Sequence, residues 1–268
     1  MKDHLLEIVE KEKRESSKLN IMREYLQAFI LKILQENKFF NAAAFAGGTA
    51  LRFAYDLPRF SEDLDFASTR ENGEDLEYYV KLLQRELSLT GYDLSVSSNF
   101  SKTVNYSFIK FEGLKYEAGI SPHRREKLMI KLELDVNPPA GAIVERVIKN
   151  KYFLLSFMIY DLSSLLSGKI HALIFRRYTK GRDWYDLLWY LTSEKKPVPN
   201  FILLNNATRQ SESAYAQVSE DNWKEILKER IAECNFGKVR EEISKFLERP
   251  EEAGFLTEEN FYKLLDEY

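Results

Sequence analysis

The sequence predicts an α/β (α+β) fold, in which a small mixed sheet is flanked by helices and is followed by a mostly helical C-terminal region. Apolar residues recur at helical spacing between Ile21 and Leu34. Several segments between residues 92 and 136 alternate polar and apolar residues, as half-buried strands do. From Leu154 onward the pattern becomes helical. We therefore expect two domains, 1–150 and 151–268, with a boundary near residue 150.

The individual elements follow from periodicity and turn residues. In chain order they are helices over 3–15 and 21–34, a strand over 42–46, a helix over 49–57, strand 60–67, helix 74–89, strands 92–98, 103–112 and 127–136, and helices 221–234, 237–248 and 257–268. Thr49 is a suitable N-cap for the short helix after Gly47 and Gly48, and Pro58 ends that helix. Residues 42–67 are therefore predicted to form a strand, a glycine turn, a short helix and a second strand.

The composition is that of an ordinary globular protein. With 268 residues, of which 44% are hydrophobic and 13% aromatic, the chain can bury a sizeable core. A formal net charge of -3 argues against a protein that holds nucleic acid by its overall charge, although a local basic groove is compatible with it.

Cysteine and histidine usage narrows the chemistry. The single cysteine, Cys234, excludes an internal disulfide framework and a cysteine-based zinc site, and it indicates a reducing compartment. The three histidines lack the HExxH spacing of a zinc site. The first residues are charged and lack a signal-peptide core, and no apolar run approaches the roughly 20 residues of a membrane helix. We therefore expect a soluble, cytoplasmic protein.

Paired acids provide the first functional signal. In FSEDLDFA, Asp63 and Asp65 lie two residues apart on a predicted strand and so share one face. Two adjacent carboxylates repel each other unless a cation lies between them, and magnesium prefers such oxygen ligands. Asp135, with Glu133 as the alternative, is a candidate for a third carboxylate on a neighbouring strand. The alternative interpretation is that each acid is a solvated residue of an edge strand.

A glycine pair supports a phosphate site close to these acids. Gly47 and Gly48 end a predicted strand, where backbone N–H groups and a helix N-terminus can approach a phosphate. The hydroxyls of Thr49 and Ser61 lie nearby in sequence. A glycine pair alone is more often only a turn, but its combination with the acids favours a magnesium-dependent enzyme that handles nucleotide phosphates.

Three stretches resemble a known family. GGTALRFAYDLPRFSEDLDF, IKLELDVNPP and SGKIHALIFRRYTKGRDWYDLLWYL occur in that order. They resemble the motifs of the AbiEii/AbiGii-type nucleotidyltransferase toxins, within the DNA polymerase β-like nucleotidyltransferase superfamily. The likeness spans roughly residues 40–192 and fades beyond Pro197. It implies a nucleotidyltransferase-like fold and a metal-dependent enzyme that moves a nucleoside monophosphate from an NTP to an acceptor.

The resemblance also implies roles for individual residues. Gly47, Gly48, Thr49 and Ser61 would hold the triphosphate. In the same way Asp63 and Asp65 would bind two magnesium ions, with the third carboxylate open between Asp135 and Glu133, and Lys169 and Asp183 would be active-site residues. Arg59, which directly precedes the Phe60-Ser61 step, is a further candidate for phosphate contact.

Lys169 and Asp183 also have simpler interpretations. Lys169 shares a helix side with Leu165 and Leu173, so it is either a solvated lysine or a cation that needs a partner. In an active site it would neutralise charge on the phosphates. Asp183 opens a predicted helix and could simply stabilise its N-terminus, and Asp186 one turn later could do either job.

A basic run lies between these two motifs. It consists of Arg176, Arg177, Lys180 and Arg182. These residues could bind a triphosphate or an RNA backbone, or they could simply be solvated.

The function expected from the sequence is that of a toxin in a toxin–antitoxin or abortive-infection system, which uses Mg²⁺ and an NTP. The expected acceptor is RNA, at the 3′ end of tRNA, and the expected partner is a cognate antitoxin. One alternative keeps the chemistry but transfers to a small molecule or a protein side chain. Another is a catalytically inactive binding protein of the same fold.

Overall fold

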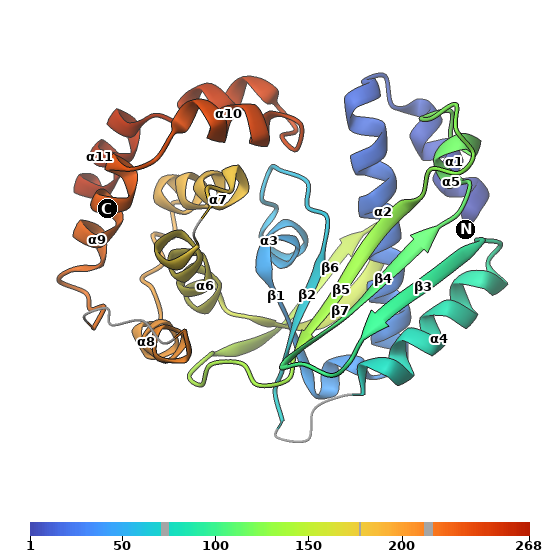
Figure 1. Ribbon diagram of the computed structural model, residues 1–268, viewed down its shortest axis with the longest axis horizontal. Coiled ribbons are helices and arrows are strands. Elements are labelled where there is room, and N and C mark those ends of the chain that lie inside the picture. Colours follow the sequence, from blue (N-terminus) through green and yellow to red (C-terminus); the bar gives the residue numbers. More distant parts are fainter. Residues whose placement is uncertain (71–74, 177, 212–216) are drawn as a thin grey trace. The chain divides into compact units, whose positions relative to one another are not determined.

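The computed structural model describes residues 1–70, 75–176, 178–211 and 217–268 and has a mixed α/β fold (Figure 1). The chain divides into two compact units. Unit 1 comprises Met1–Asp56, Phe60–Pro138 and Arg146–Ile159, and unit 2 comprises Leu57–Arg59, Pro139–Glu145 and Tyr160–Tyr268. Each unit is therefore built from more than one stretch of the chain.

Within the described residues, one sheet holds seven strands in the order β3-β4-β5-β2-β1-β7-β6. Their bounds are β1 (Ala43–Ala46), β2 (Leu64–Ser68), β3 (Leu94–Asn99), β4 (Val104–Phe111), β5 (Leu128–Asp135), β6 (Val144–Lys151) and β7 (Phe153–Tyr160). Strand β2 is antiparallel to β1 and parallel to β5, while β4 is antiparallel to both β3 and β5. The sheet is therefore mixed, as the sequence predicts.

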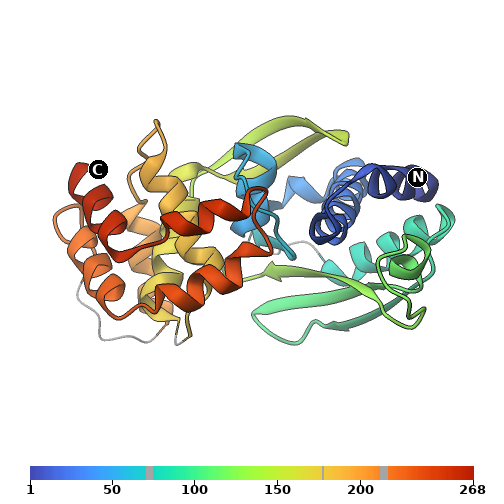
Figure 2. The same cartoon turned by 90° about the horizontal axis from the view of Figure 1, so that it is seen from above.

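The helices of unit 1 are α1 (Lys2–Lys11), α2 (Glu15–Glu36), α3 (Gly47–Tyr55), α4 (Leu76–Leu89) and the one-turn α5 (Leu114–Glu117), with a 3-10 turn η1 (Phe39–Asn41). Helix α2 contains the apolar stripe predicted from residues 21–34 and packs beside α1 and α4 (Figure 2). Asp75 caps α4 by accepting hydrogen bonds from the N–H groups of Glu77 and Tyr78.

Alternation along β4 and β5 gives the sheet two different faces. Helices α2 and α4 contact these strands along one face, where Ile109, Ile130 and Leu132 are fully buried. The residues between them point to the opposite face and are polar or aromatic, and they are Tyr106, Phe108, Lys131, Glu133 and Asp135. The candidate functional residues of unit 1 therefore lie on the face opposite the α2–α4 core.

The helices of unit 2 are α6 (Leu162–Phe175), α7 (Gly181–Thr192), α8 (Phe201–Gln210), α9 (Trp223–Ala232), α10 (Phe236–Ser244) and α11 (Glu258–Glu267), with a 3-10 segment η2 (Pro250–Phe255). Helix α7 packs against both α6 and α10. Gly181 permits the close approach of α10, because a Cβ at this position would lie 2.6 Å from the Val239 carbonyl oxygen. Trp184, Phe236 and Phe261 form the aromatic core beneath α7.

The structure corrects the prediction that the chain becomes helical at Leu154. Residues 153–160 instead form β7, which lies between β1 and β6 in the sheet, and α6 begins only after Asp161. The stretch FLLSFMIY is almost entirely apolar, so periodicity alone does not distinguish a buried strand from a buried helix. The predicted boundary near residue 150 falls at the end of β6, whereas the two units exchange segments at residues 57–59 and 139–145.

Within the residues that the structure covers, no helix combines the length and the hydrophobicity needed to cross a lipid bilayer.

Candidate active site

The acids of unit 1 gather where β2 and β5 run side by side. Asp65 lies on β2 and is paired in register with Glu133 on β5, so the two side chains point to the same face. Asp63 directly precedes β2, two residues before Asp65. Strand alternation and register therefore bring two of the predicted metal-binding residues, Asp63 and Asp65, together with the alternative third carboxylate.

The preferred third carboxylate, Asp135, lies two residues beyond Glu133, at the end of β5. Its register partner is Ala67 rather than an acid. Its carboxylate accepts a 2.9 Å hydrogen bond from the Asn137 N–H, and burial raises its pKa despite this bond. The register thus favours Glu133 over Asp135 as the neighbour of Asp65, while the metal role of either residue stays a prediction.

Lys131 is a member of this cluster that the sequence motifs did not indicate. Its ammonium lies 2.6 Å from a carboxylate oxygen of Glu133. Partial burial alone would lower the pKa of Lys131, but the hydrogen bond to Glu133 and the charges of Glu133 and the two aspartates raise it. Extending the alternation of β5 back from Glu133 would have placed Lys131 on the same face.

The glycine turn approaches the carboxylates directly. Gly47 adopts a left-handed conformation with φ of +73°, and a Cβ on this residue would lie 2.3 Å from Oδ2 of Asp65. Gly48 is buried in the first turn of α3, where backbone N–H groups have no partner within the helix. The turn and the second aspartate therefore border the same space, which suits a phosphate that bridges backbone N–H groups and a metal ion.

We expect Gly47→Ala to impair the site more than the fold. The new methyl group would displace the Asp65 carboxylate and strain the backbone by about 1–3 kcal/mol. The nucleotidyl transfer expected from the sequence should fall by about a hundredfold, because active-site geometry tolerates displacements of less than about 1 Å. Gly91→Ala is the matched control: Gly91 also has a positive φ, of +90°, but a Cβ on this residue would meet nothing within 4 Å. Equal loss of activity in both variants would contradict this assignment.

Thr49 forms a hydrogen bond within the protein, and the roles of Thr49 and Ser61 as triphosphate ligands stay predictions. Thr49 is fully buried, and its hydroxyl donates a hydrogen bond to the Asp63 carbonyl oxygen. It is not the N-cap of α3, which is Ala46. This hydrogen bond therefore links α3 to Asp63, the first residue of the acidic pair. The Ser61 side chain is half-buried, and its carbonyl oxygen accepts a 3.2 Å hydrogen bond from Gln27.

Unit 2 brings the other predicted catalytic residues together. The Lys169 ammonium on α6 lies 3.1 Å from Oδ1 of Asp183 and 2.7 Å from Oδ2 of Asp186, both on α7. Arg176 also pairs with Asp183. The apolar side of α6 thus presents a lysine that has acidic partners, and Lys169 is not a solvated residue.

Arg59, the predicted phosphate contact, has a buried carboxylate as its partner in the structure. Its guanidinium is 1% exposed and forms hydrogen bonds of 2.6 and 2.7 Å to the two carboxylate oxygens of Asp186. Its backbone bridges to Leu247 in the same unit. Because the side chain is enclosed and its planar group is matched to a carboxylate, Arg59 is a structural anchor for Asp186.

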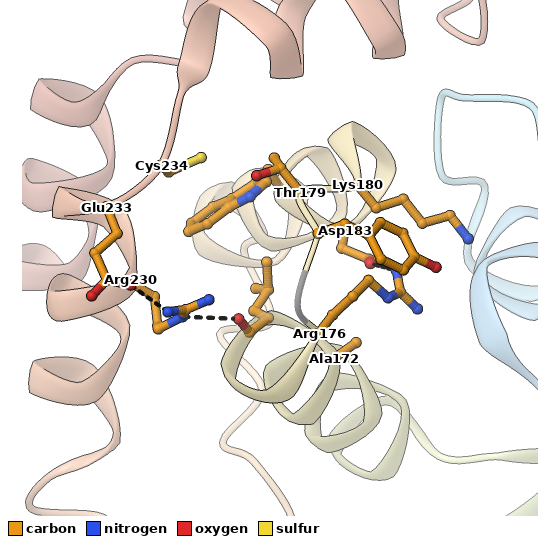
Figure 3. Close-up of a pocket in the computed structure, with 11 residues that line it drawn as sticks. Ala172, Arg176, Thr179, Lys180, Asp183, Arg230, Glu233 and Cys234 are labelled. Atoms are coloured by element: carbon orange, nitrogen blue, oxygen red, sulfur yellow. Dashed lines mark hydrogen bonds and ion pairs between the residues drawn. The ribbon is translucent and has the colours of Figure 1, made fainter.

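The basic run lies beside this cluster. Arg176 and Lys180 line a pocket between α6, α7 and α9, together with Asp183 and Arg230 (Figure 3). Burial and the positive charges of Arg182 and Arg176 lower the pKa of Lys180. Such a concentration of cations favours an anionic ligand. The guanidinium of Arg182 lies over the Phe246 ring, and Arg177 lies outside the described residues.

Acidification should weaken unit 2 through Asp183. Burial alone would raise the pKa of Asp183, but Lys169 and Arg176 hold it below the ordinary value of 3.8. The ionised carboxylate therefore contributes stability above that value, and this contribution is lost as the pH falls toward the lowered pKa. Chemical denaturation between about pH 5 and pH 3 should show a steeper loss for the wild type than for Asp183→Asn. Parallel pH profiles would contradict this expectation.

The carboxylates of unit 1 suit magnesium better than a metal that needs many protein ligands. Among the described residues no three or more histidine, cysteine or acidic side chains form a group that could hold a metal ion. Magnesium, however, commonly takes one or two carboxylates and completes its shell with water and substrate phosphates. Asp63 and Asp65, of which Asp65 has its carboxylate beside the Gly47 turn, fit that kind of site.

Comparisons with known proteins identify the family and the fold of the chain. Residues 30–262 match the family described as "Nucleotidyl transferase AbiEii toxin, Type IV TA system". A crystal structure of a candidate nucleotidyltransferase from H. pylori is similar with a TM-score of 0.54 and 20% identity, and covers 91% of this chain and 95% of its own. The crystal structure of JHP933 from Helicobacter pylori is similar with a TM-score of 0.53 and 18% identity, and the match covers 92% of this chain and 94% of that one. These similarities show the nucleotidyltransferase-like fold. No curated protein matches the chain.

Proposed function

The chain belongs to the AbiEii nucleotidyl transferase toxin family of type IV toxin–antitoxin systems, and from this premise we propose that it transfers a nucleoside monophosphate from an NTP to RNA. The single observation that best supports the proposal is the approach of Gly47 to Asp65. Because Gly47 lies so close to the Asp65 carboxylate, this position has no room for a side chain. A phosphate bound here could contact both the backbone N–H groups of the turn and a cation held by the carboxylate.

Unit 1 would hold the nucleotide. The N–H groups of Gly47 and Gly48 would bind phosphate oxygens at the start of α3. Asp63 and Asp65 would hold magnesium, which would stabilise charge on the phosphates when bound, and Glu133 stays the candidate for a further carboxylate beside them. Thr49 would act as a positioning residue, because its hydrogen bond fixes the backbone of Asp63.

The reaction exchanges one phosphorus–oxygen bond for another. A hydroxyl oxygen of the acceptor forms a bond to the α-phosphorus, and the bond to the bridging oxygen breaks so that pyrophosphate leaves with the electron pair. The hydroxyl proton passes to a carboxylate of the β2–β5 face. Such transfers depend mainly on positioning and on neutralisation of charge.

Unit 2 carries cations of its own that favour an anionic ligand. Lys169 and Lys180 are candidates, because Lys169 is fixed by Asp183 and Asp186 and Lys180 lines a cation-rich pocket. The proposal predicts that Lys169→Met lowers transfer while Arg59 acts only through the position of Asp186.

The family description implies an antitoxin partner. We propose that a cognate antitoxin restrains the toxin in the cell, where the transfer itself is the toxic act. A test is growth arrest on expression of the wild type but not of Asp63→Asn. Arrest by both variants would favour a binding protein without catalysis.

The acceptor class is tested with labelled substrate. Purified protein is incubated with magnesium, each α-labelled NTP in turn, and total RNA, and the label is followed after digestion with ribonuclease or protease. We expect ribonuclease-sensitive label at the 3′ end of tRNA. Label in a small molecule or a protein would contradict RNA as the acceptor, and would leave the transfer chemistry intact.

A further inference from the structure

The face of the sheet beyond the carboxylates carries two aromatic side chains. Phe108 on β4 is the register partner of Lys131 on β5, and Tyr106 is the partner of Glu133. The two rings are half-buried, and their centroids lie 5.6 Å apart. The Lys131 ammonium lies 5.3 Å from the Tyr106 ring centroid and 5.7 Å from that of Phe108. Aromatic rings and a cation are therefore presented next to the acids.

A basic pocket adjoins these rings within unit 1. It has a volume of about 270 Å³, and its charged lining consists of Arg23, Glu62, Asp63, Lys115, Lys127 and Lys131. Phe108 lines it as well. The four cations exceed the two acids, and one of those acids, Asp63, is a candidate metal ligand. Each of the four cations also pairs with an acid, so a phosphate would bind here by exchanging with those carboxylates.

Two of these cations have partly exposed partners. Lys127 pairs with Glu112 at 2.6 Å and Lys115 with Glu126 at 3.7 Å, and the four side chains are between 21% and 49% exposed. Ion pairs of this exposure contribute little, about 0–1 kcal/mol each. A phosphate group that approached these lysines would thus displace weak contacts.

The order of the strands bears on which substrate would occupy this face. From one side to the other the strands run β1, β2, β5 and β4, and β1 leads into the Gly47 turn. In-line transfer requires the attacking oxygen and the leaving pyrophosphate on opposite sides of the α-phosphorus. If the leaving phosphates lie at the turn after β1 and the metal-bound phosphate at β2, the acceptor comes from the side of β5 and β4.

We propose that the surface formed by Tyr106, Phe108, Lys127 and Lys131 binds the single-stranded 3′ end of the RNA acceptor, with bases stacked on the two rings and phosphates at the two lysines. The inference rests on the proposed function. Single-stranded nucleic acid is bound in this way by aromatic side chains set in a basic groove, and stacking tolerates any base. A protein acceptor would have no use for stacking rings beside a phosphate pocket.

Direct binding tests the proposal without catalysis. The probe is a fluorescently labelled single-stranded RNA of about ten nucleotides, titrated with the full chain in the absence of NTP and magnesium. We expect the Tyr106→Ala/Phe108→Ala double variant to bind at least about tenfold more weakly, whereas Tyr106→Phe retains the ring and stays within about twofold of the wild type. Equal binding by the wild type and the double variant would overturn the proposal.

A second pair of variants tests the lysines. Lys127→Ala should weaken RNA binding and reduce the slope of the logarithm of affinity against the logarithm of salt concentration by about one. Lys81→Ala is the control, since Lys81 is an exposed cation on α4. If both variants behave alike, Lys127 does not contact phosphate and the proposed surface is wrong.

Kinetics separate this inference from the proposed function. The Tyr106→Ala/Phe108→Ala variant should raise the KM for RNA about tenfold and leave the KM for NTP unchanged. An unchanged KM for RNA, in a wild type that does transfer to RNA, would overturn the surface and leave the proposed function standing. A wild type that transfers to no acceptor would overturn the proposed function, whatever the binding assay gives.

Discussion

Replacing Asp63 or Asp65 with asparagine is expected to lower the rate of nucleotidyl transfer by about a thousandfold. In the proposed site either change removes a negative ligand of the metal ion, and the loss of one preorganised electrostatic contact typically costs about a hundred- to a thousandfold in rate. Both residues are half-buried, so the fold should survive. Initial rates with a labelled NTP measure the loss of activity, and a thermal melt of each variant shows whether it is still folded.

Matched variants sharpen this expectation. Asp56→Asn alters an exposed carboxylate of the same unit that pairs with Lys149, and should leave the rate unchanged. Glu133→Gln should lose nearly as much as Asp65→Asn because the two positions are paired in register, whereas Asp135→Asn should lose less. A larger loss at Asp135 than at Glu133 would restore Asp135 as the third carboxylate.

Arg59→Met is expected to destabilise unit 2 by about 3 kcal/mol, the low end of the range for breaking a buried ion pair. The change removes two short hydrogen bonds to Asp186, while Lys169 still contacts the same carboxylate and limits the loss. Urea denaturation of the wild type and the variant measures the difference. Arg209→Ala, which removes an exposed arginine from the same unit, is the control and should fall within about 0.5 kcal/mol of the wild type.

The same variant distinguishes the two roles considered for Arg59. A structural anchor predicts lower stability, with a KM for NTP that is close to normal while the variant is folded. An unchanged stability together with a strongly raised KM for NTP would instead show that the arginine contacts phosphate.

Local patterns explain which elements were predictable from the sequence. The stripe from Ile21 to Leu34 fixed α2, and alternation in 127–136 fixed β5 and the face of its acids. Strand β7 was missed because its run of apolar residues continues into the apolar α6. The break between them is Asp161, whose carboxylate accepts the Ser164 N–H and caps α6.

In the candidate site, too, some features depend on neighbouring residues and were predictable, whereas others depend on residues far apart in the sequence. The adjacency of Asp63 and Asp65 and their nearness to Gly47 depend on a few neighbouring residues, and the sequence contains that information. The role of Arg59 depends on Asp186, a residue 127 positions away, and no local pattern identifies such a partner. The same holds for the register that places Glu133, rather than Asp135, beside Asp65.

We propose that this toxin-family chain moves a nucleoside monophosphate by means of the acids beside the Gly47 turn. The most direct measurement compares ATP, CTP, GTP and UTP labelled at the α-phosphate with the same nucleotides labelled at the γ-phosphate, for the wild type and Asp63→Asn, with RNA present. We predict that the wild type transfers the α-label to RNA and releases the γ-label as pyrophosphate, and that Asp63→Asn does neither. Transfer of the γ-label to the acceptor, or unchanged transfer by Asp63→Asn, would contradict the claim.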